Sequence, residues 1–181
     1  MPGRKKNIVE LTHVTLKDYR NLPKYPVRVM LDSVRSMHNV GSVMRTCDAF
    51  LIDGVILCGI SGTPPHPDIH KTALGAEDSV EWRYCADAVQ EAMRLKGEGW
   101  KICVLEQAHG SIPLHEFFPE KGEKYLLVAG NEVEGVDQKI VDIADTVLEI
   151  PQYGVKHSLN VSVSCGIALW HIFSKLDSGN S

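Results

Sequence analysis

The chain has 181 residues, 44% of them hydrophobic and 23% charged, and a formal net charge of −4 at pH 7. These proportions are typical of one ordered globular domain and exclude a disordered or fibrous protein. No apolar run approaches the roughly 20 residues that cross a bilayer, and the basic start of the chain lacks the apolar stretch of a signal peptide. We therefore expect a cytoplasmic protein without membrane contact.

The net charge bears on nucleic-acid binding, and the cysteines bear on the redox state. A negative net charge counts mildly against nucleic-acid binding, because phosphate contacts usually accompany a basic surface. It leaves room for a local basic patch, and residues 4–6 are interpreted either as a solvated start or as an arm that grips phosphate. The five cysteines contain no C-x-x-C pair, which indicates reduced core residues.

The expected elements begin with an extension, residues 1–26, in which residues 9–19 could form a short helix that Pro23 and Pro26 stop. A domain of residues 27–176 follows, and then a short tail of residues 177–181. Within the domain, apolar and β-branched runs predict strands at 27–31, 55–58, 80–84, 102–105, 125–129 and 146–150. Helical spacing predicts helices at 39–50, 86–96 and 158–176.

This alternation of short apolar strands and helices is typical of an α/β fold, in which a mostly parallel sheet has helices on both faces. Ligands of such sheets bind beyond the carboxyl ends of the strands. The glycine-rich and polar turns follow Leu31, Ile60, Leu105, Ala129 and Ile150, which are the expected strand ends. The sequence therefore predicts one ligand site along that edge.

The first polar motif, residues 39–45, follows the first strand of the domain. Asn39 suits a helix N-cap, and Gly41 allows a close approach of the backbone. Arg45 lies nearly two helical turns further on, so we expect it to point to the same end of the sheet as Asn39. The alternative is an ordinary capped helix with a surface arginine.

The second motif, residues 128–136, is a buried strand that enters a polar turn. Gly130 could present bare backbone to a ligand, and Glu132 could anchor the turn or hold a polar partner. The motif lacks the Lys-Ser/Thr ending of a phosphate loop, and the chain contains no G-x-G-x-x-G. The alternative is a solvated turn without a ligand.

The third motif, residues 150–163, is a strand end followed by a flexible loop and a long apolar helix. Ser158 is expected to cap that helix. Asn160 stands near the helix start against its own propensity, which suggests a local task. The alternative is a plain cap with a buried asparagine, and His157 beside it is interpreted as a solvated loop residue.

A metal site is not expected. His66 and His70 superficially suggest a pair of ligands, but Pro67 between them makes a helical pair unfavourable, and no third ligand is evident.

Taken in order, the three motifs resemble the signature motifs of the SpoU family within the SPOUT methyltransferase superfamily. Residues 71–76 also resemble a recurring family segment, and the likeness covers about residues 27–176. The matching positions are Asn39, Gly41 and Arg45 (N-x-G-x-x-x-R), Gly130, Glu132 and Gly135 (G-x-E-x-x-G), and residues 158–162 (S-L-N-V-S).

The resemblance implies features that the residue pattern alone would not predict. The C-terminal part of the sheet would thread a deep trefoil knot, whereas the pattern alone predicts an ordinary open sheet. The knot would bind S-adenosylmethionine, largely through backbone groups, and the active sites would lie at the interface of a homodimer. The implied cofactor contacts are Leu105, Glu106, Gln107, Gly130, Asn131, Ile150 and Leu159.

The implied reaction is methyl transfer to a ribose 2′-hydroxyl of RNA, with Arg45 as the catalytic residue. An arginine with a pKa above about 12 is a poor base, so we expect it to hold a phosphate and stabilise a developing alkoxide. Asn39 would orient Arg45 or the ribose, and Glu132 would hold the second motif. Ser158 and Asn160 would fix the knot loop and the substrate side.

Transfer RNA is the favoured substrate, because the chain lacks the additional N-terminal RNA-binding domain of many family members that modify ribosomal RNA. Two alternatives remain. One is the same chemistry on ribosomal RNA, and the other is a SPOUT-fold RNA-binding protein without catalytic activity, which the intact Arg45 and Asn160 disfavour.

Overall fold

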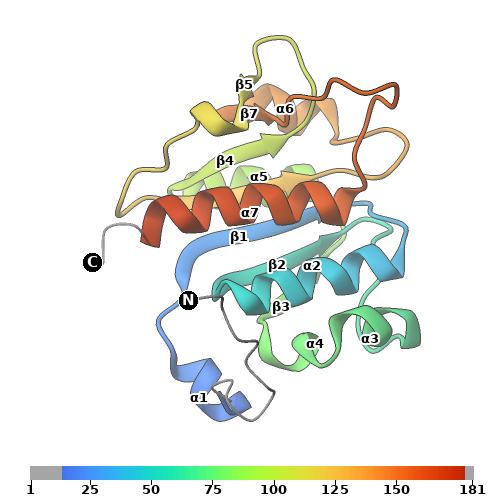
Figure 1. Ribbon diagram of the computed structural model, residues 1–181, viewed down its shortest axis with the longest axis vertical. Helices are drawn as coiled ribbons and strands as arrows, with labels where there is room; N and C mark the ends of the chain where they lie inside the picture. Colours follow the sequence, from blue (N-terminus) through green and yellow to red (C-terminus); the bar gives the residue numbers. More distant parts are fainter. Residues whose placement is uncertain (1–13, 178–181) are drawn as a thin grey trace, which may run out of the picture.

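The computed structural model describes residues 14–177, which form a seven-stranded sheet in the order β3-β2-β1-β6-β4-β7-β5 (Figure 1). Every pair of neighbouring strands is parallel. The strands are β1 (Tyr25–Asp32), β2 (Ile52–Cys58), β3 (Trp82–Cys85), β4 (Trp100–Leu105), β5 (Ile112–Pro113), β6 (Lys124–Ala129) and β7 (Thr146–Glu149).

Helices cover both faces of this sheet, which confirms the expected α/β fold (Figure 1). In the view of Figure 1, α2 and α7 lie across the front face, and α5 and α6 lie behind the strands. The helices are α1 (Leu16–Asn21), α2 (Met37–Ala49), α3 (Pro67–Ala73), α4 (Ala76–Ser79), α5 (Ala88–Gly97), α6 (Gln138–Ile143) and α7 (Val161–Asp177), with a 3₁₀ turn at Leu114–Glu116.

The sheet separates two hydrophobic cores, because successive side chains of a strand point to opposite faces. Val27, Val29 and Leu31 of β1 pack into the core under α2 and α7. Met30 packs into the core under α5 and α6. All five cysteines are free; Cys85 is half-buried and the other four are buried, as the sequence predicts.

Two helices begin at residues that the sequence analysis did not choose. Ser36, and not Asn39, is the N-cap of α2, because its hydroxyl accepts the backbone N–H of Asn39 at 3.3 Å. Asp87 caps α5 through the N–H of Gln90 at 3.0 Å, so this helix begins at Ala88. Serine and aspartate are both preferred N-caps. Asn39 therefore lies in the first helical turn, and its side chain is free for tertiary contacts.

The structure tests only in part the expectations for the N-terminal extension, the knot and membrane contact. The helix α1 ends before Pro23, as expected, whereas residues 9–13 and the basic cluster at residues 4–6 lie outside the described residues. The threading of the chain into a knot stays a prediction. No helix within residues 14–177 combines the length and the apolar character needed to span a bilayer.

Glu91 is a buried charge on the inner side of α5, with a relative exposure of 5%. Its carboxylate accepts hydrogen bonds from Arg94 at 2.8 and 3.1 Å and also contacts Arg83. Burial alone would raise the pKa of Glu91, but the bonds from the two arginines outweigh it and lower the pKa to about 2. This ion cluster joins α5 to β3.

We predict that Glu91→Gln lowers the free energy of unfolding by about 1.5–3 kcal/mol at neutral pH, the usual loss for hydrogen bonds to a charged group. Because the folded pKa lies below the unfolded value, the stabilisation by Glu91 is present above about pH 4.3 and is lost as the pH falls toward 2. Urea unfolding of both proteins over this pH range measures the difference. A difference that stays constant with pH would contradict the assignment.

Candidate functional site

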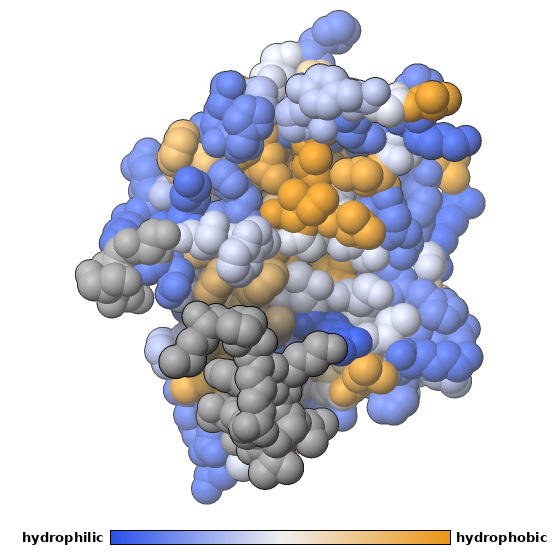
Figure 2. Space-filling model, viewed as in Figure 1, coloured by the Kyte–Doolittle hydropathy of each residue, from blue (hydrophilic) through white to orange (hydrophobic). Residues whose placement is uncertain are grey.

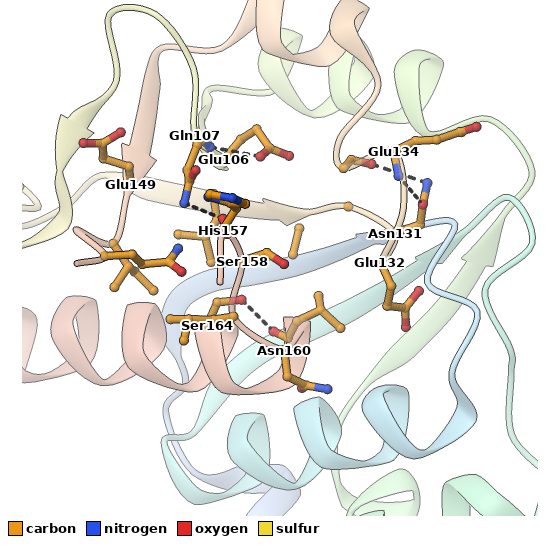
Figure 3. A pocket seen from close by; sticks show the side chains of 18 of the residues that line it. Glu106, Gln107, Asn131, Glu132, Glu134, Glu149, His157, Ser158, Asn160 and Ser164 are labelled. Carbon is orange, nitrogen blue, oxygen red and sulfur yellow. Dashed lines mark hydrogen bonds between the residues drawn. The ribbon is translucent and has the colours of Figure 1, made fainter. Parts of the chain in front are cut away.

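A cavity of about 510 Å³ lies at the carboxyl ends of the central strands, where the sequence predicts a ligand site. It is bounded by the turns that follow β4, β6 and β7 and by the start of α7 (Figure 3). All the residues that the family resemblance assigns to the cofactor line it: Leu105, Glu106, Gln107, Gly130, Asn131, Ile150 and Leu159. Glu132, Ser158 and Asn160 line it as well.

The turn after β6 is closed by its own backbone. The N–H of Asn131 donates to the carbonyl of Gly135 at 3.2 Å, and the N–H of Gly135 donates back at 3.1 Å. The side chain of Asn131 accepts the N–H groups of Val133 and Glu134 at 2.9 and 2.8 Å. A Cβ atom on Gly130 would lie 1.9 Å from the carbonyl carbon of Gly135, so only glycine fits there.

Two side chains tie the turn after β4 to its neighbours. The carboxylate of Glu106 accepts the N–H of Gln107 at 2.9 Å and the N–H of Val136, after the β6 turn, at 3.2 Å. The side-chain amide of Gln107 donates to the carbonyl of His157, in the loop after β7, at 3.0 Å (Figure 3). The three walls of the cavity are therefore linked directly.

Asn39, Glu132 and Asn160, one residue from each motif, form a hydrogen-bonded network between α2, the β6 turn and α7. The Asn39 amide donates to Glu132 Oε1 at 2.9 Å. The Asn160 amide donates to Asn39 Oδ1 at 3.1 Å. The same Glu132 carboxylate also accepts the backbone N–H groups of Arg35 and Ser36 at 3.2 and 3.3 Å. The structure thus brings together residues that lie 93 and 121 positions apart.

The hydrogen bonds to Glu132 stabilise its ionised form. Partial burial would raise the pKa of this carboxyl, but the bonds from Asn39, Arg35 and Ser36 together outweigh the burial and lower the pKa. Glu132 is therefore a carboxylate at neutral pH and can only accept hydrogen bonds. A side chain fixed in this way serves as an anchor better than as a proton donor.

The expected cap of the last helix is wrong. Helix α7 begins at Val161, and Asn160 Oδ1 accepts the N–H of Ser162 at 2.9 Å and of Val163 at 3.4 Å, so Asn160 is the capping side chain. Ser158 is exposed at the rim of the cavity and forms no side-chain hydrogen bond within residues 14–177. Asparagine disfavours helix interiors but suits this position, which accounts for its placement.

Arg45 lies apart from this network. It lines a second cavity, of about 500 Å³, between α2 and α3, together with Ser42, Thr46, Ala49, Phe50, Lys71 and Thr72. Arg45 was expected to point to the same end of the sheet as Asn39, but the two side chains have different surroundings: Asn39 bonds to Glu132, and Arg45 lines the second cavity. Six residues of a helix correspond to a rotation of about 240° and a rise of about 9 Å, which separates the two side chains.

Two motif residues have structural tasks that the sequence analysis did not assign. A Cβ atom on Gly41 would lie 2.2 Å from Thr72 Oγ1, so the close approach that Gly41 allows is that of α3 to α2. The hydroxyl of Ser162 donates to Asn160 Oδ1 at 2.7 Å and so supports the network. Ser36, a preferred N-cap residue shortly before the helical run, was the available signal for the α2 cap.

The histidine pair does not form a ligand set. His66 is the N-cap of α3, with Pro67 as the first helical residue, so the proline begins this helix and does not interrupt it. His70 Nδ1 lies 2.5 Å from Glu77 Oε1. Within residues 14–177, no group of three His, Cys, Asp or Glu side chains is placed to hold a metal ion.

The fold is that of an α/β protein with a parallel sheet, and a turn-lined cavity at the carboxyl edge of such a sheet is the usual place of a small-ligand site. The family model described as "SpoU rRNA Methylase family" matches residues 26–170. The chain therefore belongs to the SpoU family.

Two curated relatives act on different RNAs according to their names. A tRNA (guanosine(18)-2′-O)-methyltransferase of Aquifex aeolicus is 32% identical over 148 residues, which cover 78% of this chain and 66% of the relative. A 23S rRNA (guanosine-2′-O-)-methyltransferase of Neisseria meningitidis is 30% identical over 158 residues, which cover 87% of this chain and 62% of the relative. The chain thus spans less than two thirds of the length of these relatives.

Solved structures show the same fold. The A. aeolicus TrmH/SpoU tRNA modifying enzyme superposes with a TM-score of 0.81 at 28% identity, covering 91% of this chain and 84% of that one. An AdoMet-bound rRNA methyltransferase from Sinorhizobium meliloti superposes with a TM-score of 0.76 at 26% identity, covering 84% of this chain and 58% of that one.

Substitutions of Asn160 should separate its two tasks. We predict that Asn160→Ala lowers the free energy of unfolding by about 0.5–2 kcal/mol, because it removes the cap of α7. Asn160→Asp keeps an equally good cap, but an aspartate cannot donate to Asn39 Oδ1.

Asn160→Asp should therefore retain most of the stability, as measured by urea unfolding, and Asn160→Ala should not. Ser164→Ala, one turn further along α7, is the matched control and should leave the stability near that of the unchanged protein. Equal losses in Asn160→Ala and Ser164→Ala would show that Asn160 is not the cap.

Proposed function

We propose that this chain is an S-adenosylmethionine-dependent RNA methyltransferase that acts on a ribose 2′-hydroxyl, with transfer RNA as the favoured substrate. The single observation that carries the proposal is the meeting of the turns after β4, β6 and β7 around one cavity lined by all the residues that the SpoU resemblance assigns to the cofactor. The relatives named as RNA 2′-O-methyltransferases support the same activity.

The cavity fits this cofactor in size and in chemistry. Its volume of about 510 Å³ lies within the range usual for small-ligand sites. Gly130 leaves the backbone of the β6 turn open to a close neighbour, and the turns at Leu105, Ile150 and Leu159 offer further backbone groups. Glu106, Glu132, Glu134 and Glu149 give the cavity a negative lining, which favours a ligand that carries a sulfonium and an ammonium group.

S-adenosylmethionine supplies a methyl group that is already activated by a positively charged sulfur. The remaining task of the protein is to position the ribose oxygen, which can contribute roughly 7–11 kcal/mol, and to stabilise that oxygen as it loses its proton. Arg45 suits the second task, because its guanidinium is exposed and forms no hydrogen bond or ion pair within residues 14–177. We assign two tasks to Arg45: it binds the phosphate beside the target ribose, and it stabilises the developing alkoxide.

The network of Asn39, Glu132 and Asn160 positions the other parts. It fixes the start of α2, and therefore the direction of the helix that carries Arg45, against the β6 turn that lines the cofactor cavity. Ser158, exposed at the rim, is free to contact the substrate. Asn39, Glu132 and Asn160 therefore act through the geometry of the site, and Arg45 acts on the reacting group.

A complete site requires a second copy of the chain, because Arg45 and the cofactor cavity are separate in one chain. Helix α7 offers a surface for that copy. Val163, Ile167 and Trp170 follow one another at helical spacing and are 50%, 41% and 56% exposed. Figure 2 shows an apolar patch over the region of α7 on this face. We assign this α7 patch to a homodimer interface, whose closure brings Arg45 of one protomer to the cavity of its partner.

Transfer RNA is kept as the favoured substrate, because the superposition with the structure named as a tRNA modifying enzyme has the higher TM-score, 0.81 against 0.76 for the structure named as an rRNA methyltransferase. Ribosomal RNA with the same chemistry is the alternative, and the experiment below tests both pools.

Arg45→Ala should bind S-adenosylmethionine with unchanged affinity in calorimetry and should lose methyl transfer by at least about 100-fold, the usual effect of removing one electrostatic stabiliser. Transfer is measured as label from the methyl-labelled donor that enters bulk transfer RNA or ribosomal RNA. Arg20→Ala is the control, because Arg20 is an exposed arginine of α1. Wild-type transfer by Arg45→Ala would refute its role, and no label in either pool from the unchanged protein would refute the activity.

The shared site can be tested by mixing two inactive variants. Arg45→Ala lacks the guanidinium, and Ile150→Trp fills the cofactor cavity with an indole. After the variants exchange subunits, the mixed dimers should each contain one intact site, and random pairing should restore about a quarter of the activity. No recovery from two folded, dimeric variants would show that each chain uses its own Arg45.

A further inference from the structure

Arg35, just before α2, and Arg45, on its outward side, have no acidic partner among the described residues. His38, Ser42 and Arg45 follow one another at intervals of four and three residues, so they lie along one side of α2, and Arg35 directly precedes the N-cap Ser36. Arg35, His38 and Arg45 are exposed. The guanidinium groups of Arg35 and Arg45 form no hydrogen bond or ion pair in the part of the chain that the structure describes. Unpaired arginines are notable in a chain with a net charge of −4.

Lys71 of α3 joins this stripe at the end where Arg45 lies, because both residues line the second cavity. Lys71 Nζ contacts Asp68 Oδ1 at 2.7 Å, which uses one of its three donors. Its side chain remains 65% exposed. The side chain of Lys71 can therefore reach a second anion without losing the first.

No carboxylate lines the second cavity, and its lining contains the cations of Arg45 and Lys71. The hydroxyls of Ser42 and Thr72 both donate to the carbonyl of His38, at 2.8 and 3.0 Å, and are therefore already engaged. The donors that remain are those of Arg45 and Lys71. A phosphodiester matches this pair, since a guanidinium forms a two-pronged contact with phosphate and an ammonium adds a point charge.

The other end of the stripe lies at the edge of the cofactor cavity. The backbone N–H of Arg35 donates to Glu132, which lines that cavity. From Met37, the first residue of α2, to Arg45 the helix rises by about 12 Å, a length that exceeds one phosphate. The stripe therefore connects the two cavities.

We propose that the α2 track, made of Arg35, His38, Arg45 and Lys71, binds the sugar–phosphate backbone of RNA, and that Arg35 and Lys71 are positioning residues at its two ends. This inference rests on the proposed function and extends it to residues outside the three motif patterns. Local cations of this kind supply RNA affinity in a chain whose net charge is negative, because a phosphate contact depends on the charges near it.

The test measures the affinity of poly(U) and of bulk transfer RNA over a series of potassium chloride concentrations. Arg35→Gln and Lys71→Gln should each reduce the slope of log K against log salt by about 1, equally for both RNAs. Arg35→Lys and Lys71→Arg should restore the slope, because each keeps the charge. Lys101→Gln is the matched control, because Lys101 is exposed near the amino end of β4 and its substitution removes one positive charge, as the other two substitutions do.

Steady-state methylation provides the second readout. Both glutamine variants should raise the KM for RNA several-fold and leave kcat and the donor affinity near the values of the unchanged protein, a split that a damaged fold would not produce. If the salt slopes of Arg35→Gln and Lys71→Gln equal that of Lys101→Gln, the α2 track is wrong. Methylation of RNA by the unchanged protein would, in that case, still support the proposed enzyme. An unchanged protein that binds neither RNA would overturn the track and the proposed function together.

Discussion

The carboxylate of Glu132 is the contact on which the arrangement of the site depends. It accepts the side-chain amide of Asn39 and two backbone N–H groups at the start of α2, and Asn39 in turn receives the amide of Asn160. The α2 start, the β6 turn and the α7 start therefore share one set of hydrogen bonds. A helix start has unpaired N–H groups, and an ionised acceptor placed there satisfies them and fixes the helix direction.

This network accounts for the shape of the cavity to which we assign the cofactor. Glu106 and Gln107 attach the β4 turn to the other walls, and Gly130 lets the β6 turn fold back on itself. The walls of the cavity are therefore held in place by hydrogen bonds within the protein. A site of this kind is pre-organised, because its walls are fixed by bonds that do not involve the ligand.

The division between the two cavities has a simple consequence for the chemistry. The groups that suit a charged cofactor gather at the carboxyl edge of the sheet, where the lining is acidic. The cations that suit phosphate lie along α2, where the second cavity lacks carboxylates. Opposite charges kept apart in one chain can meet across an interface, and the proposed interface is the exposed apolar side of α7.

The sequence by itself determined the elements and the candidate residues, because strand periodicity, caps and glycine positions are local properties. The alternation of Val27, Val29 and Leu31 identifies the face of β1 that packs into one core. Asn39, Glu132 and Asn160 of the three motifs meet in one network, whereas Gly41 packs against α3 and Arg45 lines the second cavity. Only the tertiary structure decided that Asn160 caps α7 and contacts Asn39, and that Arg45 faces another cavity. The physical reason is that contacts between residues 121 positions apart and the rotational phase of a helix depend on how whole elements pack, which no local pattern records.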